Sequence, residues 1–159
     1  MENVVLKSEL SLCKLEELDD TLKALVNSAI MATDNSYSPY SNFRVGAAVR
    51  LLDGTVVIGA NQENAAFSVT MCAERAAIFN AQSNHPDLPI TDIAIAAKNT
   101  EGLVKTPVSP CGSCRQVILE MEHRYKRNIR ILLCGADFVY VINSIKDLLP
   151  LSFVDESMH

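Results

Sequence analysis

Apolar residues recur along this chain with two spacings, and each spacing predicts a different kind of element. Over residues 12–32 they return at every third or fourth position, which is the spacing of an amphipathic helix. Farther along, apolar runs are bounded by turn-forming residues, which is typical of strands. The predicted helices cover residues 12–32, 72–81 and 111–125, the predicted strands cover residues 44–52, 55–59, 93–97, 129–133 and 138–142, and a helical turn covers residues 145–149.

The order of these elements indicates an α/β protein. Two strands follow the first helix and are joined by Asp53-Gly54, which is a strong hairpin signal. Helices then alternate with the remaining strands, and this order predicts one mixed sheet covered on both faces. No repeat, low-complexity tract or linker divides the sequence. We therefore expect a single domain over residues 1–159, in which residues 1–12 are an N-terminal extension with no assigned role.

Composition and charge narrow the classes of function. Hydrophobic residues make up 48% and charged residues 21% of the 159 residues, a balance typical of a soluble globular protein. No apolar run reaches the ~20 residues that span a bilayer, and the N-terminus lacks the pattern of a signal peptide. We therefore expect a cytoplasmic protein without a membrane partner. The net charge of −5 also argues against a nucleic-acid partner.

One basic cluster departs from this acidic composition. It comprises Arg124, Lys126, Arg127 and Arg130, and it lies at the end of the third predicted helix. Cations are favoured there because the helix dipole places partial negative charge at the C-terminus. We interpret the cluster as a solvated helix end in preference to a phosphate site.

The strongest chemical signal is Pro110 followed by Cys111 and Cys114 at the start of a predicted helix. Two cysteines three positions apart lie on one face of a helix. The positive N-terminal end of the helix favours thiolate over thiol. This arrangement is half of a zinc site, but taken alone it is also compatible with a redox dithiol or with a chance pair in a core.

A second motif supplies a third thiol. Cys72 begins another predicted helix and is followed by Ala73 and Glu74. Three thiolates and one open position are typical of a catalytic zinc site that activates water. Glu74 is near enough to reach that water and to exchange a proton with it, although without the cysteines we would interpret it as an acid that complements the helix dipole. Three thiolates overcompensate the zinc charge, so we expect Arg75 to contact the ligand sulfurs.

The other potential ligands do not provide a fourth. We interpret His85, His123 and His159 as surface residues, and Cys13 and Cys134 as small apolar side chains in the core. The five cysteines are an odd number, which fits reduced thiols or metal ligands better than a disulfide framework.

Together these motifs resemble those of the cytidine deaminase family, whose zinc motifs are Cys-Ala-Glu and Pro-Cys-x-x-Cys. Residues 38–48 are similar to the family's first-strand segment, residues 61–66 to its nucleoside-binding loop, and residues 148–153 to its ending. The resemblance covers most of the chain. It departs at Phe67, a position at which the family often has tyrosine.

The resemblance implies a fold, a cofactor and a reaction. The implied fold is a three-layer α/β/α sandwich around a five-stranded mixed sheet, and the implied cofactor is one Zn²⁺ per subunit. The implied reaction is hydrolytic deamination of cytidine and deoxycytidine to uridine and deoxyuridine, with release of ammonia, in pyrimidine salvage. Family members of this short, three-cysteine type are homotetramers with shared active sites, so the resemblance implies the same assembly here.

Roles for individual residues also follow from the resemblance. Cys72, Cys111 and Cys114 are the implied zinc ligands, and Glu74 is the implied proton shuttle. The resemblance implies that Phe43 packs against the base and that Phe153 of a neighbouring subunit also contacts it. Asn61 and Glu63 are the implied hydrogen-bond partners of the 3′-hydroxyl. The Ala73 backbone N–H is the implied donor to the pyrimidine carbonyl. Without the resemblance, the two phenylalanines would be interpreted as core residues, and Asn61 and Glu63 as loop residues.

Three rival interpretations stay open at the level of sequence. The substrate of a related deaminase could be a free base, a nucleoside antibiotic or a cytosine in a nucleic acid, although Asn61 and Glu63 would occupy the 3′ position at which a polynucleotide continues. A non-catalytic zinc protein would have no need of Glu74. A thiol oxidoreductase with a CxxC motif would hold no stoichiometric zinc.

Overall fold

A mixed sheet of seven strands forms the centre of the computed structural model, which describes residues 1–158. The sheet has the order β1-β7-β6-β4-β2-β3, and β5 pairs with β4. The strands are β1 (Ser11–Cys13), β2 (Arg44–Leu51), β3 (Val56–Ala60), β4 (Ile90–Asn99), β5 (Gly102–Leu103), β6 (Arg130–Cys134) and β7 (Val139–Ile142). β4 and β6 run parallel, whereas the other pairs run antiparallel.

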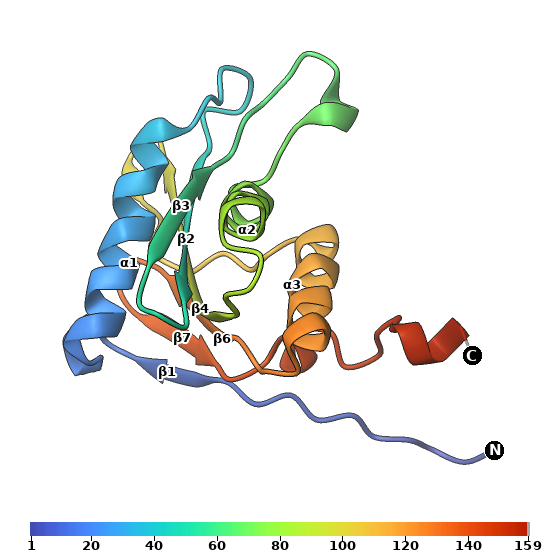
Figure 1. Ribbon diagram of the computed structural model, residues 1–159. Helices are drawn as coiled ribbons and strands as arrows, with labels where there is room; N and C mark the ends of the chain where they lie inside the picture. Colours follow the sequence, from blue (N-terminus) through green and yellow to red (C-terminus); the bar gives the residue numbers. More distant parts are fainter. Residues whose placement is uncertain (159) are drawn as a thin grey trace.

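Three α-helices cover the two faces of this sheet. They are α1 (Asp20–Ala32), α2 (Ala73–Asn84) and α3 (Gly112–Tyr125). α1 lies on one face, and α2 and α3 lie side by side on the other (Figure 1). This arrangement confirms the expected three-layer α/β/α sandwich. None of these helices, nor any other helix within residues 1–158, is long and apolar enough to cross a membrane.

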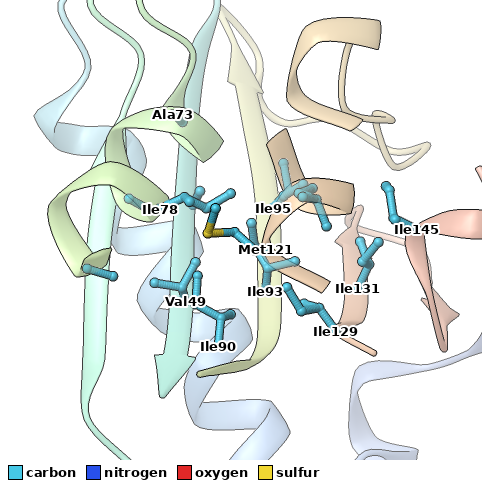
Figure 2. Packing of buried hydrophobic residues seen from close by; sticks show 14 of the residues in the cluster. Val49, Ala73, Ile78, Ile90, Ile93, Ile95, Met121, Ile129, Ile131 and Ile145 are labelled. Carbon is cyan, nitrogen blue, oxygen red and sulfur yellow. The ribbon is translucent and has the colours of Figure 1, made fainter. Parts of the chain in front are cut away.

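The central strand β4 separates two hydrophobic cores. Ile93 and Ile95 face α2 and α3, whereas Ala94 and Ala96 face α1, because successive side chains of a strand point to opposite faces. Figure 2 shows the first core, in which isoleucines of β4 and β6 meet Ile78 of α2 and Met121 of α3. All of these side chains are at least nine-tenths buried, and they fix both helices against the sheet.

Two glycines allow the helices to approach the sheet closely. A Cβ atom at Gly59 of β3 would lie 2.3 Å from the backbone nitrogen of Ala77 in α2. At Gly46 of β2 it would lie 2.2 Å from the carbonyl oxygen of Ala29 in α1. Any larger residue at either position would push a helix outward. Gly59 therefore helps to set the position of α2, the helix whose N-cap residue is Cys72.

The structure corrects the predicted strand count and the start of the first helix. The five predicted strands are present as β2, β3, β4, β6 and β7, but the sheet also contains β1 and β5. β5 has only two residues, too few to give a pattern. The first helix is expected to begin at residue 12, but α1 begins at Asp20. The side chain of Asp19 caps the start of α1, because it accepts a hydrogen bond from the N–H of Leu22 at 2.9 Å. Residues 11–13 instead pair with β7, so the N-terminal extension adds an edge strand.

A buried glutamate connects α3 to the segments that follow it. The carboxylate of Glu122 accepts hydrogen bonds from the backbone N–H of Ile129 at 2.8 Å and of Ile145 at 3.1 Å, and from the Ser144 hydroxyl at 2.8 Å. Its side chain is only 4% exposed. Glu122 thus ties α3 to the start of β6 and to the helical turn at Ile145–Asp147.

We expect Glu122→Ala to lower the free energy of unfolding by about 2–4 kcal/mol, because it leaves two buried N–H groups without an acceptor. Urea unfolding followed by circular dichroism measures this loss. Glu120→Ala, at an exposed position of the same helix, is the matched control and should change stability by less than about 0.5 kcal/mol. Equal effects of the two substitutions would show that the buried hydrogen bonds contribute little.

Candidate metal centre

The first turns of α2 and α3 meet at one edge of the sheet and bring three cysteines together. Cys72 is the N-cap residue of α2, Cys111 is the N-cap residue of α3, and Cys114 lies in the first turn of α3. The sulfurs of Cys72 and Cys111 are 3.9 Å apart, and those of Cys111 and Cys114 are 3.5 Å apart. All three sulfurs lie within 4.8 Å of one another.

This geometry fits a zinc ion. Zinc binds thiolates at about 2.3 Å in a tetrahedral arrangement, which places ligand sulfurs about 3.8 Å apart. The two measured separations lie on either side of that value. Cys13 and Cys134 are outside the group: Cys13 is half-buried in β1, and Cys134 is buried in β6, where burial raises the pKa of its thiol to about 12.

The electrostatics of Cys111 and Cys114 also favour a cation. Burial and the nearby Glu74 carboxylate raise the pKa of Cys114. Burial also tends to raise the pKa of Cys111, but a hydrogen bond from the Cys114 backbone N–H and hydrogen bonds with the thiols of Cys114 and Cys72 outweigh it and lower that pKa. A divalent cation among the sulfurs would stabilise all three thiolates together.

Glu74 lies next to the cysteine group in the first turn of α2. Its side chain is only 5% exposed, and burial raises the pKa of its carboxyl above the usual range. Hydrogen bonds from its own backbone N–H and with the Cys114 side chain lower this pKa, but burial outweighs them. A buried carboxyl with a raised pKa can both accept and return a proton, which is what a general acid–base catalyst must do.

Two arginines follow the two motifs, and they have different contacts. Arg75 donates a hydrogen bond from Nη2 to the sulfur of Cys72 at 3.5 Å, and this bond raises the pKa of its guanidinium. Arg115 donates instead to the carbonyl oxygens of Pro110, at 2.9 Å, and Leu148, at 2.6 Å. Arg75 thus offsets negative charge on a sulfur, whereas Arg115 holds the segment that leads into Cys111.

A cavity of about 230 Å³ opens beside the cysteine group. Cys72, Glu74 and Cys111 line one part of the cavity, and apolar and polar residues line the rest. The residues that line the cavity are Phe43, Val45, Asn61, Glu63, Thr70, Met71, Cys72, Ala73, Glu74, Ile95, Val108, Ser109 and Cys111.

Asn61 already holds the backbone around the cavity. Its Oδ1 accepts hydrogen bonds from the Val45 N–H at 2.8 Å and from the Ser36 hydroxyl at 2.6 Å, and its Nδ2 donates to the carbonyl oxygen of Phe43 at 2.9 Å. An asparagine side chain has two donor and two acceptor positions, so one N–H remains for a ligand.

Glu63 anchors the loop that precedes β2. Its carboxylate accepts hydrogen bonds from the Ser41 hydroxyl at 2.5 Å and from the backbone N–H groups of Tyr40 and Ser41 at 2.8 and 3.3 Å. The bond from the Ser41 hydroxyl makes the largest contribution to lowering the pKa of Glu63. Glu63 is therefore an ionised acceptor on the wall of the cavity.

Of the remaining residues predicted to contact the nucleoside, Phe43 and Ala73 line the cavity and Phe153 does not. Phe43 is half-buried on the wall, and Ala73 is fully buried at the first position of α2, where backbone N–H groups lack partners within the helix. Phe153 is 61% exposed and lies outside this cavity. Its carbonyl oxygen accepts a hydrogen bond from Gln116 Nε2 at 2.9 Å, which ties its segment to α3.

The sequence interpretation missed several residues of the wall. Met71 and Ser109 each lie one or two positions before a cysteine motif, so their closeness to the motifs was a usable signal. Val45 and Ile95 lie on the neighbouring strands β2 and β4, and only the register of those strands brings them to the same cavity.

Comparison with known proteins identifies relatives that match most of this chain. The family model of the cytidine and deoxycytidylate deaminase zinc-binding region matches residues 19–128. A cytidine deaminase of Halalkalibacterium halodurans is 40% identical over 144 residues, which cover 85% of this chain and 96% of that protein. A cytidine deaminase of Mycoplasma genitalium is 32% identical over 83% of this chain and 95% of its own length.

The solved structures that resemble this chain are also cytidine deaminases. The crystal structure of cytidine deaminase from Burkholderia pseudomallei has a TM-score of 0.69 and 38% sequence identity, over 82% of this chain and 97% of that one. Cytidine deaminase from Mycobacterium tuberculosis has a TM-score of 0.67 and 32% identity, over 86% and 99% of the two chains.

Proposed function

The chain belongs to the cytidine and deoxycytidylate deaminase family, and on that premise we propose that it hydrolyses cytidine and deoxycytidine to uridine and deoxyuridine, with release of ammonia. The observation that carries this proposal is the position of Glu74. Its buried carboxyl lies on the wall of the same cavity as Cys72 and Cys111, so a metal ion, a proton carrier and a small substrate can meet there.

In the proposed mechanism Cys72, Cys111 and Cys114 hold the zinc ion. Bound zinc supplies a Lewis acid that lowers the pKa of a water molecule toward neutrality. Glu74 takes a proton from the attacking water and gives it to the ring nitrogen next to C4, as the water oxygen bonds to C4. Glu74 then takes the second water proton and gives it to the amino group, which leaves as ammonia.

We assign the nucleoside contacts to the other residues of the cavity. Phe43 packs against the pyrimidine ring, because an aromatic face suits a flat base. The Ala73 backbone N–H donates to the pyrimidine carbonyl. Asn61 offers its remaining N–H, and Glu63 its carboxylate, to the 3′-hydroxyl. These contacts favour a free nucleoside over a polynucleotide, which would have no free hydroxyl there.

A homotetramer with shared active sites is part of the proposal. Phe153 is exposed and does not line the cavity of its own chain, so its ring is available to the cavity of a neighbouring subunit. The bond from Gln116 would hold its segment in place for this contact. Sedimentation equilibrium should give four times the 17.4 kDa chain mass, and a monomeric mass would contradict the assembly.

We further propose a single-domain enzyme that acts in the cytoplasm, in pyrimidine salvage. Its zinc site depends on three free thiols, and such thiols stay reduced in that compartment.

A product assay on the purified, zinc-loaded protein tests the proposed reaction. Uridine and ammonia should appear in equal amounts from cytidine, and deoxyuridine and ammonia from deoxycytidine. Absence of both products from a folded sample with one zinc per chain would contradict the proposed substrates. Assays with free bases and modified nucleosides would then identify the alternative.

A further inference from the structure

A second hollow lies far from the cysteine group, at the other end of strand β2. Val45 of β2 lines the first cavity and Arg50 lines the second, and the five intervening steps along a strand span about 17 Å. The second hollow has a volume of about 390 Å³. The residues that line it are Arg50, Leu51, Leu52, Thr91, Asp92, Arg127, Asn128, Arg130 and Asn143.

Three of the residues that line this hollow form a row of charged side chains across three strands. Arg50 of β2 pairs in register with Asp92 of β4, and Asp92 pairs with Arg130 of β6. Arg50 donates to Asp92 Oδ2 from Nε at 3.0 Å and from Nη2 at 2.6 Å, and Arg130 donates from Nε to Oδ1 at 2.7 Å. The Thr91 hydroxyl adds a bond of 2.7 Å to Oδ2. One carboxylate therefore fixes two guanidinium groups.

Asp92 is well suited to this positioning role. Its side chain is only 1% exposed. Burial alone would raise the pKa of Asp92, but the hydrogen bonds from Thr91, Arg130 and Arg50 outweigh burial and lower it. The carboxylate therefore stays charged at neutral pH and holds both arginines in place.

The fixed arginines keep hydrogen-bond donors to spare. A guanidinium has five N–H groups, and Asp92 occupies only the Nε side of Arg130 and the Nε and Nη2 groups of Arg50. The other guanidinium nitrogens of both residues have no hydrogen-bond partner within residues 1–158. The side chain of Arg127, on the loop before β6, likewise has no partner in this described part of the chain, and it lines the same hollow.

Charge and donor chemistry both select an anion. Three guanidiniums against one carboxylate leave an excess of positive charge in the hollow, although the chain as a whole carries −5. Asn128 and Asn143 add amide groups at the wall. Planar guanidiniums bind phosphate oxygens through paired hydrogen bonds, better than they bind a spherical anion such as chloride.

The structure also divides the basic cluster that sequence alone favoured as a solvated helix end. Arg124 stacks on Tyr125 and donates to the Pro86 carbonyl oxygen, and Lys126 faces the C-terminal segment. Arg127 and Arg130 instead line the hollow. Only these two members, joined by Arg50 from β2, form a convergent set.

We propose that this hollow is a binding site for a phosphate group, carried either by orthophosphate or by an organic phosphomonoester. The site stands apart from the zinc centre, and its ligand class follows from Arg50, Arg127 and Arg130 around a buried, orienting carboxylate. The proposal does not depend on the deaminase reaction.

Thermal unfolding of the zinc-loaded protein tests the proposal with two probes, sodium phosphate and glycerol 3-phosphate. At 10 mM we expect one of them to raise the Tm by about 2–4 °C over sodium chloride of equal ionic strength, because a ligand that binds the folded state stabilises it. Isothermal titration calorimetry then gives the affinities. Tighter binding of glycerol 3-phosphate identifies a phosphomonoester as the ligand, and tighter or equal binding of inorganic phosphate identifies orthophosphate.

Arg127→Gln is the informative variant because the Arg127 side chain makes no hydrogen bond or ion pair within residues 1–158, so the protein should fold normally. We expect it to weaken binding of the preferred probe about tenfold, the loss of one charge-assisted contact. Lys126→Gln removes the same charge one residue away, outside the hollow, and should change affinity by less than about twofold. No Tm shift beyond the chloride control, or equal losses in the two variants, would overturn the proposal.

Discussion

Glu74→Gln is expected to lower kcat for cytidine deamination by about 10²–10⁴-fold while the protein keeps its zinc. Glutamine has nearly the same shape as glutamate, so the first turn of α2 and the three sulfurs should stay in place. It cannot accept a proton at neutral pH, however, and the buried position of Glu74 gives bulk water little opportunity to replace it. The loss should therefore appear in kcat more than in KM.

The measurement is the rate of uridine and ammonia release, together with the zinc content of each sample. Glu101→Gln, at an exposed position after β4, is the control and should retain the wild-type rate. If Glu74→Gln kept its zinc and turned over within tenfold of the wild type, another group would have to carry the proton. If it lost its zinc, Glu74 would act on the metal centre instead of on the substrate.

The cysteine motifs could be predicted because the chemistry is local in sequence. Cys111 and Cys114 share one helical turn, and Glu74 follows Cys72 within the first turn of another helix. Helix starts and the Asp53-Gly54 turn are likewise encoded within a few residues, and β2 and β3 form the expected hairpin. What the sequence could not supply was the spacing of the three sulfurs, which depends on how α2 and α3 pack on the sheet.

The residues that line the zinc-site cavity and the second hollow come together through strand register, which the sequence pattern does not determine. Val45 and Ile95 reach the zinc-site cavity because β2 and β4 pair antiparallel with a particular offset. Asp92 meets Arg50 and Arg130 for the same reason, although it lies 42 positions from the first and 38 from the second along the chain. In the sequence these three residues look like ordinary surface charges near the ends of strands, so nothing there indicates that they meet.

Cys111→Ala is expected to lose most of the bound zinc and to lower turnover by more than about 10³-fold. Two thiolates cannot hold the ion as three do, and without zinc the water in the cavity keeps its high pKa. Cys111 is the most informative ligand to replace because it is exposed, whereas Cys114 is buried, and because its side chain makes no capping hydrogen bond to α3. The substitution should therefore remove a ligand and leave the helix end intact.

Zinc content by atomic absorption, far-ultraviolet circular dichroism and the uridine assay together decide the outcome. Cys13→Ala is the matched control: it also removes a thiol, but from β1 and outside the cysteine group, so it should keep both zinc and activity. A Cys111→Ala protein with a full complement of zinc would show that the ion is held elsewhere. A zinc-free Cys111→Ala protein that still released uridine at the wild-type rate would separate the metal from catalysis and leave Glu74 to act without it.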